Sequence, residues 1–220
     1  LGDVADYLTG FPFRSDEYVA DGIKLLRGDN IVQGALRWRD VKRWPASKKE
    51  PYTKYELDEE DVVLAMDRPW IDAGLKYAAV TKRDLPALLV QRTARLRGTS
   101  ELNNRFLRYV IGSPWFAKYI QRITTGSLVP HISGTQIKSF RFRLPPLNQQ
   151  SQIAAVLSAL DAKIDLNNRI NAELEAMART LYDYWFVQFD FPDENGRPYK
   201  SSGGKMVYNP VLKREIPEGW

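Results

Sequence analysis

The sequence predicts an α+β lobe followed by one long α-helix, and three observations lead to this fold class. Short apolar runs bounded by turn residues alternate with two amphipathic segments before residue 147. From residue 148 to about 184, apolar residues recur three or four positions apart, and neither Pro nor Gly interrupts them before Pro192. The charge divides at the same place, since residues 1–147 contain 24 Lys and Arg against 17 Asp and Glu, whereas residues 148–220 contain 8 against 10.

The lobe, residues 1–147, carries both strand and helix signals. Ser100 is expected to cap a helix that ends near Ile111. Ser113, followed by Pro114 at the first helical position, predicts a second helix through Ile123. Apolar runs between turn residues predict strands at residues 62–66, 77–80, 88–96 and 140–144.

The long helix begins at Asn148, whose side chain is suited to an N-cap. At 1.5 Å per residue it would be roughly 55 Å long, so it needs a partner helix, and an antiparallel coiled coil is expected. Asn167 and Asn171 either lie in the seam and fix its register, or face water on a helix whose apolar stripe drifts. The predicted seam consists of Ile153, Leu157, Leu160, Ile164, Asn167, Asn171, Leu174 and Leu181.

The composition excludes several classes of protein. There is no cysteine, so disulfides, thiolate nucleophiles and Cys-ligated zinc are excluded. The start of the chain lacks the pattern of a signal peptide and no apolar run is long enough to span a bilayer, so we expect a cytoplasmic protein without a membrane partner. No nucleotide-binding or metalloprotease motif is present, and the acidic run 58–61 more readily forms a turn before a strand than a metal site.

A basic stretch between residues 37 and 55 is interleaved with Trp38, Trp44 and Tyr55. Such a segment can neutralise phosphates while its planar groups pack on sugars or bases. The alternative is a solvated loop whose aromatic side chains pin it to the core. The candidate DNA contacts in this stretch are Arg37, Arg39, Lys42, Arg43, Lys48, Lys49, Tyr52 and Lys54.

A series of segments along the chain carries a resemblance to a known family: residues 1–4, 10–13, 22–31, 61–66, 132–137, 144–147, 149–150, 153–154, 157–164 and 185–190. In this order they resemble the specificity subunit of type I restriction-modification systems over essentially the whole chain. Asn148 departs from that pattern, because many members carry Glu there. The segment 215–220 is similar to the element that precedes a recognition domain, so the chain looks like one repeat of a two-repeat family, either a natural half-subunit or a truncated form.

The resemblance implies a division of labour along the chain. Residues 1–147 would be a target recognition domain that reads one half of a bipartite site in double-stranded DNA. Residues 148–190 would form the spacer helix, which dimerises and docks methyltransferase subunits, and residues 191–220 would be a linker or tail leading toward a second repeat. The chain itself would be non-catalytic and bind no cofactor, because S-adenosylmethionine, ATP and Mg²⁺ belong to methyltransferase and restriction (translocase) subunits.

Further candidate DNA contacts lie in predicted loops that offer suitable hydrogen-bond donors. His131 is the single histidine, and a structural role is an alternative to DNA contact for it. A competing interpretation of the whole chain is a non-enzymatic scaffold whose basic lobe binds acidic proteins. A homodimer is expected if the chain is a natural half-subunit. The loop candidates are Arg14, Arg27, Asn30, Thr125, Ser127, His131 and Lys138.

Overall fold

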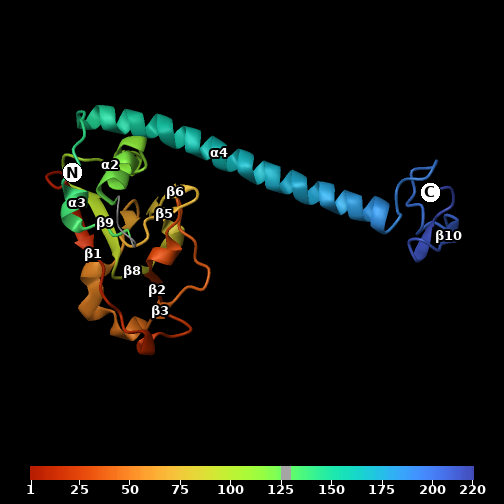
Figure 1. Ribbon diagram of the computed structural model, residues 1–220, viewed down its shortest axis with the longest axis horizontal. Helices are drawn as coiled ribbons and strands as arrows, with labels where there is room; N and C mark the ends of the chain where they lie inside the picture. Colours follow the sequence, from red (N-terminus) through yellow and green to blue (C-terminus); the bar gives the residue numbers. More distant parts are fainter. Residues whose placement is uncertain (125–129) are drawn as a thin grey trace. The chain divides into compact units, whose positions relative to one another are not determined.

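The computed structural model describes residues 1–124 and 130–220 (Figure 1). The chain separates into two compact units, Leu1–Leu157 and Ser158–Trp220. The described residues of unit 1 form a four-stranded sheet, a three-stranded sheet, a two-stranded hairpin and three short α-helices, and unit 1 also contains the first turns of the long helix α4. The predicted α+β class is thus confirmed.

The central sheet of unit 1 is antiparallel and has the strand order β1-β9-β4-β7. Its strands are β1 (Ala5–Thr9), β9 (Thr93–Gly98), β4 (Val62–Ala65) and β7 (Tyr77–Ala79). All four residues of β4 are buried, because both faces of the sheet are covered. Val62 and Leu64 belong to one core cluster, and Val63 and Ala65 belong to another.

A second sheet, with the order β3-β2-β8, covers one face of the central sheet. It consists of β3 (Arg43–Trp44), β2 (Ile23–Leu26) and β8 (Ala87–Leu89), and β2 runs parallel to β8. Leu26 and Leu89 pack toward the central sheet, whereas Leu25 and Leu88 point into an aromatic cluster on the outer side. A small hairpin, β5 (Trp70–Ile71) with β6 (Gly74–Leu75), follows β4.

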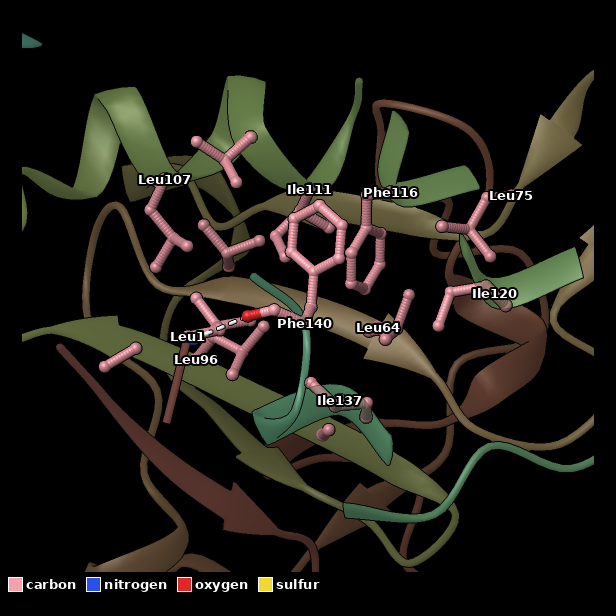
Figure 2. Close-up of a cluster of buried hydrophobic side chains, with 14 of the residues drawn as sticks. Leu1, Leu64, Leu75, Leu96, Leu107, Ile111, Phe116, Ile120, Ile137 and Phe140 are labelled. Carbon is pink, nitrogen blue, oxygen red and sulfur yellow. Dashed lines mark hydrogen bonds between the residues drawn. The ribbon is translucent and has the colours of Figure 1, made fainter. Parts of the chain in front are cut away.

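Three short helices cover the other face of the central sheet: α1 (Asn104–Ile111), α2 (Pro114–Thr124) and α3 (Gly134–Lys138). Figure 2 shows the ring of Phe116, from α2, beside that of Phe140 above the sheet residue Leu64, and the two ring centroids are 5.0 Å apart. The backbone nitrogen of Leu1 donates a hydrogen bond to the carbonyl oxygen of Phe140 at 2.7 Å, which ties the first and last segments of the lobe together.

The helix caps differ in part from the sequence predictions. Ser113 accepts a hydrogen bond from the backbone nitrogen of Phe116 at 3.2 Å, so the predicted start of the second helix is confirmed. Ser100 does not cap the first helix. Asn103 does so instead, with its side chain accepting from the backbone nitrogen of Phe106 at 3.1 Å.

Two strand predictions are corrected. The run 88–96 is two strands, because Gln91 and Arg92 turn the chain between β8 and β9. Residues 140–144 form no strand, although Phe140, Phe142 and Leu144 do pack on the core as their alternation indicates. Phe142 stacks on Phe140 with ring centroids 6.1 Å apart. Aromatic packing, rather than strand pairing, therefore fixes this segment.

Helix α4 (Leu147–Tyr182) contains 36 residues, which confirms the predicted long helix. Its start differs from the prediction, because Asn148 lies inside the helix and its side chain bonds only the adjacent nitrogen of Gln149. Gln150 anchors the helix to unit 1. Its side-chain nitrogen donates to the carbonyl oxygens of Glu101 (2.9 Å) and Pro145 (2.8 Å), and its side-chain oxygen accepts from the nitrogen of Asn103 (2.9 Å).

Unit 2 continues beyond α4 with a π-helical turn, Asp183–Val187, and a hairpin of β10 (Met206–Asn209) and β11 (Arg214–Pro217). The region predicted as a linker and tail therefore contains an ordered hairpin with Ile216 buried. Trp220 stacks on Phe191 with ring centroids 5.1 Å apart. No helix in the described part of the chain combines the length and the hydropathy needed to cross a membrane.

Replacing Gln150 by Leu should lower the free energy of unfolding by about 3 kcal/mol, because three buried backbone groups lose their partner. Urea unfolding of the full chain measures the effect. The exposed neighbour Gln149 is the matched control, and Gln149→Leu should change the free energy by less than about 0.5 kcal/mol. Equal effects of the two substitutions would show that Gln150 does not anchor the helix.

Candidate nucleic-acid interface

Several strand ends meet at one edge of unit 1. Strands β2 and β8 are parallel, so Arg27 and the turn Gln91–Arg92 follow them on the same side. Strand β4 is antiparallel to β9 with Ala65 opposite Thr93, so Asp67 and Arg68 also emerge there. The topology thus brings loops from four strands to one place, which is where binding residues usually lie.

The loops enclose a cavity of about 530 Å³, which has both charged and aromatic walls. A second hollow of about 600 Å³ shares Ser15, Tyr18 and Arg27 with it and extends to Lys42. We call the two together the basic groove. Its cationic side chains are Arg27, Lys42, Arg68, Lys76 and Arg92, and its acidic ones are Asp29 and Asp67.

The acidic side chains of the basic groove are paired. Asp67 lies 3.0 Å from Arg92 and also contacts the Nδ1 atom of His131. Asp29 lies 3.4 Å from Arg27. Among the residues that the structure describes, neither Arg68 nor Lys42 has an ion-pair partner. The groove therefore offers cations that a ligand could neutralise.

Lys76 lies on the wall of the first cavity, between β6 and β7, and only 8% of the residue is exposed. Within the described residues its ammonium group has no hydrogen-bond or ion-pair partner. Burial lowers the pKa of Lys76 below its ordinary 10.5, the charge of Asp29 acts in the opposite direction, and the charge of Arg68 lowers it further. Lys76 is thus a desolvated cation that faces a cavity.

Two arginines of the groove have left-handed backbone conformations. The φ angle is +44° at Arg68 and +64° at Arg92. Long side chains adopt such angles rarely, because the Cβ atom crowds the backbone, and glycine would adopt them without strain. An arginine kept at such a turn is consistent with a role for its side chain in the groove.

Some predicted contact residues lie in or beside the basic groove. Arg27 and Lys42 line it directly. His131 reaches its edge through Asp67, because residue 131 pairs with residue 67 in an isolated antiparallel bridge. Arg14 precedes the lining residue Ser15, but its guanidinium is paired with Asp16 at 2.7 Å.

In the basic stretch 37–55, the aromatic residues fit the alternative interpretation, in which they attach a solvated loop to the core. Tyr52 packs among Phe11, Phe13 and Trp44, with ring centroids 4.9 to 5.5 Å apart, so it is committed to the fold. Several of the predicted cations in this stretch already have partners. Lys48 lies 2.6 Å from Glu17, Lys49 lies 2.9 Å from Glu56, and Arg39 is near Asp40. Arg43 donates a hydrogen bond to the carbonyl oxygen of Gly22, and the ammonium group of Lys54 lies over the ring of Tyr55. Arg37 is exposed.

Of the four remaining predicted positions, two make contacts within the lobe and two lie outside the described residues. Asn30 is buried, because its side-chain oxygen accepts from the nitrogen of Arg27 and its side-chain nitrogen donates to the carbonyl oxygen of Arg37. Both polar atoms of its side chain therefore make hydrogen bonds within the lobe. Lys138 lies over the ring of Tyr7 at 5.7 Å. Thr125 and Ser127 lie outside the described residues.

Sequence reasoning missed Arg68, Lys76 and Arg92. Arg68 and Arg92 each come after a buried apolar run with one residue between, and this position is typical of a loop that follows a strand. Arg92 lies inside the run 88–96, which the sequence predicts as one strand, so its place in a turn is not evident from the sequence. Lys76 has no sequence signal, since only the folded chain shows that its side chain is buried. The described residues contain no cluster of His, Asp and Glu suited to a metal, and Asp61 accepts instead from Arg97 at 2.7 Å.

Replacing Lys76 by Met should stabilise the fold at neutral pH, because it removes a desolvated charge. The folded-state pKa lies below the unfolded value, so the unfolded chain binds more protons between the two values, and the stability of the wild type rises with pH there. The difference in stability between Lys76→Met and wild type should therefore become smaller as pH rises toward 10.5. Thermal unfolding at several pH values measures this difference as a difference in melting temperature. A difference that does not change with pH would contradict the assignment of Lys76 as a desolvated cation.

Comparisons with known proteins match this chain to one family. The family model of the type I restriction modification DNA specificity domain matches residues 1–176. The specificity subunit of the type I restriction enzyme EcoAI of Escherichia coli is 34% identical over 181 residues, which cover 82% of this chain and 30% of that protein. The MjaVIII specificity subunit of Methanocaldococcus jannaschii is 30% identical over 182 residues, which cover 82% of this chain and 43% of that protein.

Solved structures share the fold. A structure of a type I restriction-modification (R-M) system, solved to explain complex assembly and conformational transition, has a TM-score of 0.58 at 19% identity and covers 82% of this chain and 42% of that one. The HsdS subunit from Thermoanaerobacter tengcongensis has a TM-score of 0.53 at 20% identity, with coverage of 82% and 41%. The chain spans less than half the length of these relatives. From the match to residues 1–176, it belongs to the family of type I restriction-modification DNA specificity domains.

Proposed function

We propose that unit 1 binds double-stranded DNA through the basic groove and that the chain is a non-catalytic specificity component of a type I restriction-modification system. The observation that carries the proposal is the convergence of unpaired cations, Arg68 and Lys76 among them, in a groove of a lobe whose family is named for DNA specificity. Phosphate contacts would position the lobe and base-edge contacts would specify the half-site. A cytoplasmic location accompanies this role.

Chemistry would come from partner subunits. Relatives carry the name of specificity subunits of restriction enzymes, which supports a role in placing methyltransferase and restriction subunits on DNA. S-adenosylmethionine, ATP and Mg²⁺ would be held by those partners. The task of this chain would be to read the sequence and to hold the partners at a fixed place relative to it.

The exposed stripe of α4 supports pairing with a second helix. Leu160, Ile164 and Leu174 are each more than half exposed in the single chain, and Leu181 is nearly so. Asn167 and Asn171 lie on the same stripe and are exposed. At the start of the helix, Ile153 and Leu157 line an apolar hollow with Phe106 and Phe140. We infer an antiparallel homodimer through this stripe when no second repeat is present.

Selection from a randomised duplex library tests the proposal, using the full chain purified with its methyltransferase partner. Enrichment of any defined sequence, retained in a salt-dependent manner, would support the DNA-specificity function. A palindromic bipartite sequence would support the homodimer as well, whereas an asymmetric or single half-site would contradict it. Retention without sequence enrichment, or no retention, would favour the scaffold interpretation.

Replacing Asn167 and Asn171 together by Leu should raise the melting temperature and alter the oligomeric state, because buried Asn costs stability and fixes partner number. Light scattering and thermal unfolding measure both effects.

The control is Asp165→Leu with Glu173→Leu, which places two leucines away from the stripe at 100° per residue. Equal mass and equal melting temperature for the asparagine variant and wild type would show that Asn167 and Asn171 face water in the assembled protein.

A further inference from the structure

Lys76 is the feature of the basic groove that the fold itself does not explain. Only 8% of the residue is exposed, yet its ammonium group has no hydrogen-bond or ion-pair partner among the described residues. The side chain is largely buried, and its ammonium group, which is partly desolvated at the cavity wall, would gain from such a partner because desolvation without compensation is costly. An anion entering the cavity would supply the missing partner.

The surroundings of Lys76 suit an anion of low charge. The cavity of about 530 Å³ is lined by the cations Arg27, Arg68, Lys76 and Arg92 and by the carboxylates Asp29 and Asp67. Since Asp67 lies 3.0 Å from Arg92 and Asp29 lies 3.4 Å from Arg27, the two uncompensated charges are those of Arg68 and Lys76. Arg68 is exposed and Lys76 is buried, so one cation lies at the mouth of the cavity and the other at its wall.

The concave shape favours a phosphate over a base edge. Phosphates protrude from the surface of a duplex and can enter a cavity in a protein. Base edges lie inside the grooves of DNA, and side chains that read them must protrude from the protein instead. A buried lysine on the wall of a cavity of about 530 Å³ can reach the first kind of group and not the second.

We propose that the cavity around Lys76 and Arg68 is a phosphate-binding pocket that receives one backbone phosphate of the bound duplex, with Lys76 as the anchoring cation. This inference rests on the proposed function and deepens it. Lys76 would fix the position of the lobe on DNA and contribute equally to binding at every sequence. The same chemistry would accept free phosphate, so the experiment separates the two sources.

The test measures duplex affinity against salt concentration for the full chain with its methyltransferase partner. Lys76→Met should reduce the slope of log K against log salt by about 0.9, which corresponds to one phosphate contact. The loss should be the same on a selected duplex and on an unrelated one. The control is Lys82→Met, because Lys82 is exposed, lies outside the basic groove and is 3.8 Å from Glu59. It should leave the slope unchanged.

A scan with single methylphosphonate linkages, which are uncharged, identifies the phosphate. One linkage should weaken binding by wild type and have no further effect on Lys76→Met. A Lys76→Met variant that alters the ranking of sequences with an unchanged slope would show that Lys76 reads a base, and would overturn the proposal. A variant that retains the full slope and the full methylphosphonate effect would overturn it as well.

Inorganic phosphate separates failure of this proposal from failure of the proposed function. If wild type binds no duplex, the DNA function fails, and the pocket is then tested alone by thermal stabilisation in inorganic phosphate. Stabilisation of wild type and not of Lys76→Met would assign the pocket to a free phosphate ligand and would overturn the DNA-backbone assignment. An equal effect of phosphate on the melting temperatures of wild type and Lys76→Met would show that Lys76 does not form a phosphate-binding pocket. The melting curve of Lys76→Met without ligand verifies that the variant is folded.

Discussion

Burial of β4 on both faces is the constraint from which the architecture of unit 1 follows. Val62 and Leu64 need helices on one side, and Val63 and Ala65 need a second sheet on the other. Three layers result, and β4 ends at the edge where the parallel strands β2 and β8 also end. The basic groove thus arises from the way the hydrophobic layers are stacked, and its loops need little core of their own.

Much of this fold was predictable where local chemistry decides it. The spacing of apolar residues predicts α4, and Ser113 with Pro114 predicts the start of α2, because capping and helical periodicity act over a few residues. Residues 140–144 show the limit of this reasoning. Their alternation does indicate which side chains are buried, but a strand also needs a neighbour to pair with, and aromatic packing takes its place.

The candidate site was predictable only in part, for a related reason. Arg27 and Lys42 could be found because they are cations in loops, whereas Asn30 fits the same description and is used by the backbone around it. The role of Lys76 depends on what surrounds it in space, and a sequence does not show which lysine is desolvated. Paired charges are equally hidden, as Lys48 with Glu17 shows across 31 positions.

The desolvated charge of Lys76 also bears on how long an unoccupied chain survives. A buried cation without a partner lowers the free energy of unfolding until an anion neutralises it. If an anion binds there, free chains would open more often than occupied ones, and proteases cleave the opened form. The same lysine that would hold a phosphate would thereby shorten the lifetime of copies that have found nothing to bind.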